Sequence, residues 1–335
     1  MQPTHEVRSE SRLTAFREIP VIDISALMDR TAPDHVARQI AAACEEVGFF
    51  YAINHGVSDE LISSMFKAAE QLFGLSWDTK QHLDMANSGL TRRGYCASRW
   101  EDENSGRALD FKESFDYGAE SDEILPFFGN NIMPSELPGF RETAGTYYEA
   151  MRQVAGRLSG GIALSLGLPS DYFDHLQRDP ITNQRILRYP ALQGQAGTAD
   201  RETGAHTDFG FLTVLAQDNA GALELQNRDG DWVGTIPVTG SLLIGVGELL
   251  SSMTNRRYSS TVHRVVNRGT GPHFALSFFL DLDFHAVVEP VPTCIDDSQE
   301  EDTPLMTCGQ YKYGHYLDTQ RQLSWSRPKP PSALS

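Results

Sequence analysis

The 335-residue sequence contains few cysteines, no long apolar run and a shortage of basic residues. Its four cysteines are widely spaced and form no CxxC pair, which disfavours a zinc knuckle or a disulfide framework. No segment approaches the ~18 apolar residues of a membrane span, and the start MQPTHEVRSESRL lacks the apolar core of a signal peptide. We therefore expect a cytoplasmic protein in a reducing compartment, without membrane partners.

The shortage of basic residues also disfavours polyanionic partners. The chain has 28 Lys and Arg against 45 Asp and Glu, giving a formal net charge of −17. Such a charge repels phosphate backbones and anionic lipid head groups. Because hydrophobic residues make up 40% and charged residues 22%, close to average usage, we expect a folded globular protein with no nucleic-acid partner.

Apolar spacing predicts helices in the first half of the chain. Val36, Ile40, Cys44 and Val47 recur at helical intervals and predict an amphipathic helix. Further helices are expected at 60–75 and 146–168, strands at 19–27 and 48–58, and long loops from Ser76 to Pro138.

After Asn183, short strand-like segments alternate with turn residues. The turn Arg228-Asp229-Gly230-Asp231 between two of them favours a hairpin. Helices followed by many antiparallel strands predict a mainly β fold with flanking helices (α+β). We expect a flexible N-terminus (1–18), a helical and mixed region packing on the core (19–180), a core (181–290), and a C-terminal segment with an acidic loop and a loose tail (291–335).

The stretch GAHTDFGFLTVL places a histidine and an aspartate two residues apart in an apolar, strand-like run. On a strand, residues two apart point to the same face, so His206 and Asp208 could bind one metal ion. A second HxD pair, His82 and Asp84, lies in a helix-like or loop-like segment, where the two side chains diverge. The motif is therefore a weak signal without a third ligand.

The best third ligand is His263 in the strand-like segment STVHRVV. Two histidines and one carboxylate on one face leave three positions of an octahedral iron open, which is the arrangement of non-heme Fe(II) oxygenases. A buried core histidine is the alternative for His263. A zinc hydrolase could use the same three ligands, but nothing here supplies its general base.

The segment 181–282 resembles the Fe(II)- and 2-oxoglutarate-dependent oxygenase superfamily, specifically its isopenicillin N synthase-like group. AHTDFGFLTVLAQDNAGALELQNRDGDWVGTIP resembles the metal strand and hairpin of that group, and STVHRVVN its third-ligand strand. IPVIDIS, GFFYAINHGVS, GYCAS and FKESFDYG resemble its N-terminal domain. The resemblance runs from Ile19 to Tyr316 and implies a double-stranded β-helix, or jelly roll, with iron held by His206, Asp208 and His263.

The resemblance also implies a reaction. In the family, 2-oxoglutarate chelates Fe(II) through its keto acid end, O₂ takes the last position, and oxidative decarboxylation gives succinate and CO₂. A small organic molecule is then hydroxylated, desaturated or cyclised. We expect a non-heme iron oxidoreductase, a 2-oxoglutarate-dependent dioxygenase of secondary metabolism, with O₂ and a small molecule as its partners.

The sequence departs from the family where the distal carboxylate of 2-oxoglutarate binds. An Arg-x-Ser pair normally holds that carboxylate through charge-assisted hydrogen bonds. His273 stands at the arginine position and Ala275 at the serine position, whereas Tyr189 matches the tyrosine that usually assists. The remaining candidates for this role are Arg185, a charged His273 and Ser277.

Two alternatives stay open on these residues: a 2-oxoglutarate-independent iron oxidase of the isopenicillin N synthase type, and a non-catalytic relic binding protein. Candidate substrate-pocket residues are Phe209, Phe279 and Phe115. By resemblance, the segments that contain Arg93, Trp100 and Lys112 form the pocket lid.

Overall fold

The computed structural model describes residues 13–29, 31, 33–102, 107–123, 125–189, 204–266, 271–295 and 306–323. Most of the expected flexible N-terminus, the acidic loop at 296–302 and the proline-rich tail lie outside these residues. In the part of the chain that is described, no helix is both long and apolar enough to cross a bilayer.

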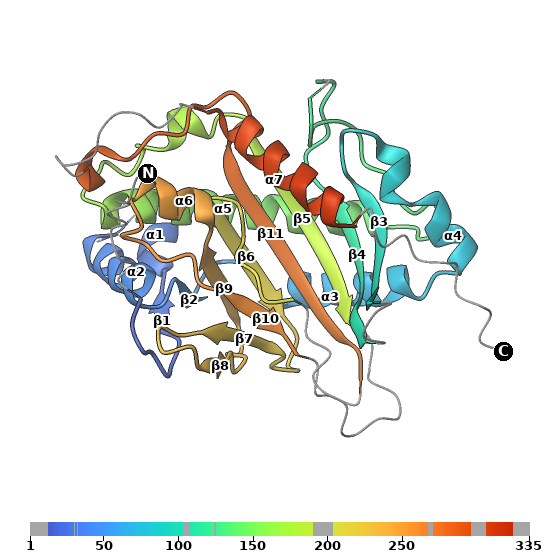
Figure 1. The fold of residues 1–335 in the computed structure, drawn as a ribbon, viewed down its shortest axis with the longest axis horizontal. Coiled ribbons are helices and arrows are strands. Elements are labelled where there is room, and N and C mark those ends of the chain that lie inside the picture. Colours follow the sequence, from blue (N-terminus) through green and yellow to red (C-terminus); the bar gives the residue numbers. More distant parts are fainter. Residues whose placement is uncertain are drawn as a thin grey trace, which may run out of the picture.

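Two β-sheets form the body of the molecule (Figure 1). The larger has eight strands in the order β1-β2-β9-β6-β11-β5-β4-β3, and the smaller has three in the order β10-β7-β8. The strands are β1 Val21–Asp23, β2 Phe49–Ile53, β3 Gly94–Asp102, β4 Arg107–Tyr117, β5 Pro180–Tyr189, β6 Leu212–Gln217, β7 Leu223–Gln226, β8 Trp232–Gly234, β9 Ser241–Val246, β10 His263–Val265 and β11 His273–Asp283.

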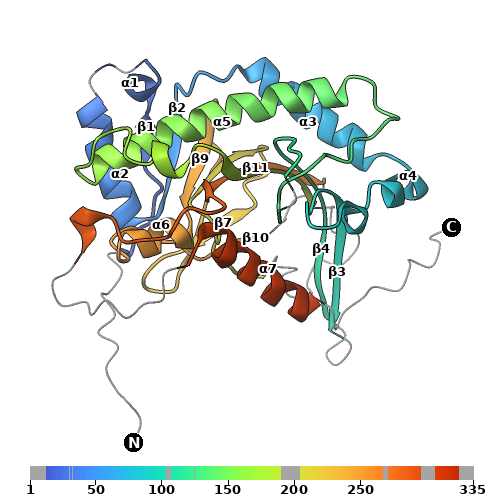
Figure 2. The same ribbon diagram turned by 90° about the horizontal axis from the view of Figure 1, so that it is seen from above.

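Helices flank the larger sheet on both sides, with α5 and α7 on opposite faces (Figure 2). The helices are α1 Ser25–Met28, α2 Pro33–Glu46, α3 Asp59–Phe73, α4 Trp77–His82, α5 Phe140–Ser165, α6 Glu248–Met253 and α7 Cys308–Leu323. Short 3₁₀ turns lie at Met85–Ser88, Asp174–Leu176 and Pro292–Cys294. The predicted mainly β fold with flanking helices is confirmed.

Strand alternation divides the larger sheet into two faces. The helix-covered face carries large apolar side chains that pack against α5. Phe278 lies 5.5 Å from Tyr148 between ring centroids, and Phe115 meets Phe140 edge-on at 5.8 Å. Because Phe115 pairs with Ile186 in the β4–β5 register and is fully buried, it belongs to this main core.

The opposite, inner face looks toward the smaller sheet. A second apolar cluster joins the two sheets and includes Leu243, Ala275 and Tyr189 of the larger sheet with Leu225 and Val265 of the smaller one. Apolar side chains therefore join the two sheets, as expected for a jelly roll.

The N-terminal region contributes strands to the larger sheet as well as packing on it. β2 pairs with β9 at one end, and β4 pairs with β5 at the other. Our expectation of long loops from Ser76 to Pro138 was wrong, because β3 and β4 form an antiparallel pair there. Buried charges at Glu113 and Asp116 interrupt the apolar alternation of β4, which hid the strand in the sequence.

The C-terminal segment is also more ordered than expected, since it contains the helix α7, which packs against β11. Lys312 forms an ion pair with the buried Asp281 of β11, and the Tyr311 hydroxyl donates to Glu248 at 3.3 Å. The sequence CGQYKYGHYLDTQRQL lacks an aliphatic stripe. α7 is held by ionic and aromatic contacts, which apolar periodicity does not detect.

Helices α2, α3 and α5 and the predicted hairpin agree with the sequence reading. In the hairpin between β7 and β8, the Asn227 side chain accepts hydrogen bonds from the backbone N–H of Asp229 and Asp231, both at 3.0 Å. Gly230 has φ +85°, a left-handed conformation that favours glycine.

Candidate metal centre and its surroundings

The HxD pair lies just before a strand, not inside one. β6 begins at Leu212, so the expected extended strand through His206 and Asp208 was wrong. Instead, His206 forms one antiparallel bridge with His263 at the edge of β10. Their backbones exchange two hydrogen bonds, with N···O distances of 3.0 and 2.8 Å. The bridge, and not strand alternation alone, brings the two histidines together.

His206, Asp208 and His263 converge so that one ligand atom from each lies within 4.8 Å of the others. Asp208 Oδ1 lies 3.7 Å from His263 Nε2 and 4.0 Å from His206 Nε2. The two imidazole centroids are 4.4 Å apart. Among the residues that the structure describes, no other group of three or more such side chains has this arrangement.

Backbone carbonyls fix the tautomer of both histidines. His206 Nδ1 lies 2.9 Å from the Gly204 carbonyl oxygen, and His263 Nδ1 lies 3.1 Å from that of Thr261. A carbonyl oxygen can only accept, so each Nδ1 carries the proton and each Nε2 keeps its lone pair. Ligand histidines in metal sites are commonly oriented in this way.

The carboxylate of Asp208 is held ionised and in one orientation. Its Oδ2 accepts a hydrogen bond from the Thr213 hydroxyl at 2.6 Å, which leaves Oδ1 facing the imidazoles. Burial favours the neutral acid, but His263, His206 and the Thr213 hydroxyl outweigh it and lower the pKa of Asp208. Burial and the neighbouring His263 lower the pKa of His206, which favours the neutral, metal-binding imidazole.

Close packing fixes the loop between the bridge and β6. A Cβ atom on Gly247 would lie 1.8 Å from the Gly210 carbonyl oxygen, and one on Gly210 would lie 2.4 Å from Asp281 Oδ1. The N–H of Glu248 donates to the Asp208 carbonyl oxygen at 2.8 Å, and the Glu248 side chain accepts from the Thr207 hydroxyl. The start of α6 therefore supports the loop from behind.

The donor set fits a divalent transition metal. Two nitrogens and an oxygen on one side of an ion leave the opposite positions open. Donors bound at about 2.1 Å and at right angles lie about 3 Å apart. The observed separations of 3.7 and 4.0 Å mean that the ligands would move together by about 1 Å on a metal.

The second HxD pair does not converge, as predicted. His82 lies at the end of α4 with Nδ1 2.9 Å from the Asp78 carbonyl oxygen. The Asp84 carboxylate accepts from the N–H of Ala86 at 2.7 Å, capping the 3₁₀ turn that follows.

Comparison with known proteins decides the family. Residues 181–282 match the family described as the 2OG-Fe(II) oxygenase superfamily, and residues 19–136 match the non-haem dioxygenase N-terminal region described for morphine synthesis. A homoarginine-6-hydroxylase of Arabidopsis thaliana is 31% identical over 301 residues, covering 84% of this chain and 90% of that protein. The chain belongs to the Fe(II)/2-oxoglutarate-dependent oxygenase superfamily.

Other relatives agree with this membership. A 1-aminocyclopropane-1-carboxylate oxidase of Dictyostelium discoideum is 30% identical over 328 residues, covering 86% of this chain and 88% of that protein. A solved Caulobacter crescentus protein described as a putative 2OG-Fe(II) oxygenase has a TM-score of 0.81 at 26% identity, covering 90% of this chain and all of that one (100%). A Neurospora crassa protein solved with α-ketoglutarate has the same fold, with a TM-score of 0.83 at 24% identity over 92% of this chain and 99% of that chain.

The oxygenase is thus a non-heme iron oxidoreductase with a jelly-roll fold that uses Fe(II) and 2-oxoglutarate. Relatives named as a 2-oxoglutarate-Fe(II) type oxidoreductase and as hydroxylases favour a 2-oxoglutarate-dependent enzyme over a 2-oxoglutarate-independent oxidase and a non-catalytic relic, the two alternatives left open by the sequence. O₂ and a small molecule are its reaction partners.

The predicted cosubstrate residues lie side by side on the inner face, on β5 and β11. Tyr189 pairs with His273, and Arg185 pairs with Ser277. The Tyr189 and His273 rings stack with centroids 5.4 Å apart and planes 20° apart. Ala275 offers only a methyl group, which packs in the apolar cluster between the sheets.

His273 is paired with an acidic residue that sequence reasoning missed. Its Nδ1 lies 2.6 Å from Asp218 Oδ1, and Asp218 Oδ2 accepts from the N–H of Phe274 at 2.6 Å. Burial opposes ionisation of Asp218, but these hydrogen bonds prevail and lower its pKa. A charged His273 would therefore belong to a neutral pair and would not be an isolated cation.

Arg185 is engaged from the side of β4. Its Nε donates to Asp116 Oδ1 at 2.7 Å, and its guanidinium carbon lies 5.8 Å from the centroid of the Phe279 ring. The negative charge of Asp116 raises the pKa of Arg185. Its side chain is 41% exposed, so the guanidinium can still meet a ligand.

Of the three predicted pocket phenylalanines, Phe279 lies on the inner face opposite Thr213 in the β6–β11 register. Phe209 stacks on His315 of α7 with centroids 4.6 Å apart. Phe115 was wrong as a pocket residue, because it points into the main core on the other face.

The residues expected in the lid have different roles. Arg93 is buried and donates to the carbonyl oxygens of Gly129 at 2.7 Å and Phe127 at 3.1 Å, so it fastens a loop. Lys112 lies on β4, and its positive charge contributes to the lowered pKa of His206. The side chain of Trp100 lies outside what the structure describes.

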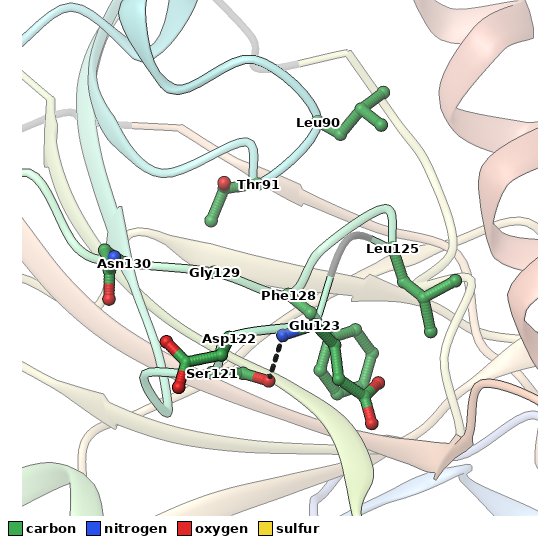
Figure 3. A pocket seen from close by; sticks show the side chains of 9 residues that line it. All are labelled: Leu90, Thr91, Ser121, Asp122, Glu123, Leu125, Phe128, Gly129 and Asn130. Atoms are coloured by element: carbon green, nitrogen blue, oxygen red, sulfur yellow. Dashed lines mark hydrogen bonds between the residues drawn. The ribbon is translucent and has the colours of Figure 1, made fainter.

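Figure 3 shows a surface hollow of about 370 Å³. It forms between Leu90–Thr91 and the 121–130 segment, where the Ser121 hydroxyl accepts a hydrogen bond from the N–H of Glu123 at 3.1 Å. None of the candidate site residues lines it.

Replacing Thr213 by valine is expected to weaken Fe(II) binding by about tenfold to a hundredfold, the range typical for partners that orient a metal ligand. Valine keeps the side-chain shape but removes the hydrogen bond to Asp208 Oδ2. Fe(II) titration of the apoenzyme measures the effect. The matched control Thr213→Ser keeps a hydroxyl and should bind Fe(II) like the wild type, whereas equal weakening in both variants would contradict the assigned role.

Proposed function

We propose that Fe(II) is bound by Nε2 of His206, Nε2 of His263 and Oδ1 of Asp208. The observation that carries this proposal is the pair of carbonyl acceptors at Gly204 and Thr261, which leaves both Nε2 lone pairs beside an ionised carboxylate. When bound, the iron activates O₂. The three protein ligands would hold it from one side, which would leave positions for 2-oxoglutarate and O₂.

We propose that Tyr189 and His273 receive the distal carboxylate of 2-oxoglutarate. With Nδ1 engaged by Asp218, His273 has Nε2 left for a ligand. The hydroxyl of Tyr189 is a second donor beside it. Ser277 and Arg185 lie further along the strands, and Ala275 supplies no hydrogen bond. A neutral His–Asp pair attracts a carboxylate less strongly than an arginine would, so we infer weaker cosubstrate binding than with an Arg-x-Ser pair.

We also propose that the substrate is a small polar molecule, bound on the inner face near Phe279, and that the outcome is hydroxylation. The proposal is supported by relatives named as homoarginine-6-hydroxylases. We further propose that 181–290 is the functional core onto which 19–180 packs, because the candidate ligands all fall in 181–290.

A cytoplasmic location without nucleic-acid or membrane partners is proposed from the four free cysteines and the net charge of −17.

The central test is cosubstrate turnover. Purified enzyme given Fe(II), 2-oxoglutarate and O₂ is expected to release succinate and CO₂ in equal amounts. Under anaerobic conditions, 2-oxoglutarate should produce the visible charge-transfer absorption of an Fe(II)–keto acid chelate. Zn(II)-loaded enzyme is the control and should do neither. Absence of both signals from Fe(II)-loaded enzyme would overturn the proposal.

A further inference from the structure

A polar cluster stands on the inner face beside the proposed substrate position. Asp116 of β4 pairs with Arg185 of β5, which pairs with Ser277 of β11. Asn183 is two residues before Arg185 on the same face of β5. In the same layer Thr213, which holds Asp208, faces Phe279 across β6 and β11. Asp116, Asn183 and Arg185 therefore lie on the same face as the loop that carries His206 and Asp208, which we call the metal loop.

The distance from the metal loop suits a small molecule. Neighbouring strands lie about 4.8 Å apart, so β4 is about 14 Å from β6 across the inner face. A ligand held at Asp116 and Arg185 would thus reach toward the iron position with its other end.

The cluster contains one buried oxygen without a partner. Asp116 is 1% exposed. Its Oδ1 accepts from Asn183 Nδ2 at 2.5 Å and from Arg185 Nε at 2.7 Å. No described residue donates to Oδ2, which is also shielded from solvent. Leaving a buried carboxylate oxygen unbonded is costly, and such atoms in native proteins call for a specific explanation.

Arg185 has the complementary property. Its hydrogen bond to Asp116 uses Nε, while a guanidinium carries five N–H donors and this side chain is 41% exposed. Asp116 Oδ2 can thus accept a hydrogen bond from a ligand, and the remaining N–H groups of Arg185 can donate hydrogen bonds to one. Since the two side chains together carry no net charge, they select a group that is itself neutral overall.

We propose that Asp116 and Arg185 form the substrate-recognition site of this oxygenase. The group they take has a hydrogen-bond donor directly beside an acceptor, as in a cyclic amide or the ammonium and carboxylate ends of an amino acid. Binding uncovers Asp116 Oδ2, so that an N–H of the ligand donates to this oxygen and the ligand oxygen accepts from Arg185. A carboxylate without a donor is rejected, because Asp116 repels it. This inference rests on the proposed function.

The test measures probe binding to the Fe(II)- and 2-oxoglutarate-loaded enzyme by anaerobic calorimetry. Thymine serves as the cyclic amide, L-homoarginine as the zwitterionic amino acid and hexanoate as the carboxylate without a donor. Thymine or L-homoarginine is expected to bind at least tenfold more tightly than hexanoate. Whichever of the two binds more tightly shows whether the site takes a cyclic amide or an amino acid. Equal binding of hexanoate, or no binding of either donor-bearing probe, overturns the inference.

Variants locate the site. Asp116→Asn replaces the acceptor Oδ2 by a donor and should weaken the preferred probe at least tenfold more than it weakens 2-oxoglutarate. The matched control Ser114→Ala lies two residues away on the same face of β4 and should bind the probe like the wild type. Unaltered probe binding in Asp116→Asn contradicts the inference.

If Asp116→Asn does not fold, Arg185→Gln gives the same comparison. A larger loss for 2-oxoglutarate than for the probe in that variant would assign Arg185 to the cosubstrate and overturn the inference. Failure of the proposed function is separate, since it appears as absence of succinate from the wild type without any probe.

Discussion

Alanine at His206, Asp208 or His263 is expected to reduce succinate release below about 1% of the wild-type rate, since losing even an outer-shell partner costs tenfold to a hundredfold. Each change removes one of the three atoms that converge within 4.8 Å. Metal content after anaerobic loading, measured together with turnover, should fall in each variant. Circular dichroism should show an intact fold, because the triad lies at the edge of a sheet and outside the main core.

The second HxD pair supplies the matched control. His82→Ala and Asp84→Ala should keep full metal content and turnover, because their side chains cap a helix end and a 3₁₀ turn. Full activity in His263→Ala would sink the assignment of the metal centre. Loss of metal in the His82 or Asp84 variants would show that the HxD motif alone had misled us.

The double variant His273→Arg/Ala275→Ser is expected to tighten 2-oxoglutarate binding by about tenfold to a hundredfold, which corresponds to the ~1.5–3 kcal/mol of charged hydrogen bonds. It restores the Arg-x-Ser pair of the family at the same strand positions, opposite Tyr189 and Leu187. The measurement is the anaerobic titration of the charge-transfer absorption with 2-oxoglutarate.

Asp218→Asn is the companion variant. It removes the charge that pairs with His273, so it should weaken 2-oxoglutarate binding in the wild-type background and matter less in the double variant. If the wild type already binds 2-oxoglutarate in the low micromolar range and the double variant gains nothing, another basic residue fills the role. The interpretation of His273 and Ala275 as a functional departure would then be wrong.

The sequence predicted the candidate metal ligands because they lie in short motifs on recognisable segments, and the structure brings the three together. It could not find Asp218, which lies 55 residues from His273 and meets it only after β6 and β11 have paired. The role of Asp116 was missed for a local reason. Asp116 is a buried charged residue in a strand, and a polar residue at a buried position interrupts the apolar alternation by which a strand is recognised.

The resemblance to the family also misplaced Phe115. Its segment resembled a pocket-forming part of the family, but the face of a strand is decided by register. The pairing of Phe115 with Ile186 turns it toward α5. A shift of one residue would have reversed the result for every side chain of β4, so no reading of the segment alone could settle the question.

The hydrogen-bonded bridge between His206 and His263 makes the two imidazoles a single mechanical unit. Because two backbone hydrogen bonds join His206 to His263, bending of the sheet edge moves both residues together and preserves the distance between them. The distance from the Asp208 carboxylate to the imidazoles therefore depends on the short segment from His206 to Leu212, where Gly210 packs closely against Gly247.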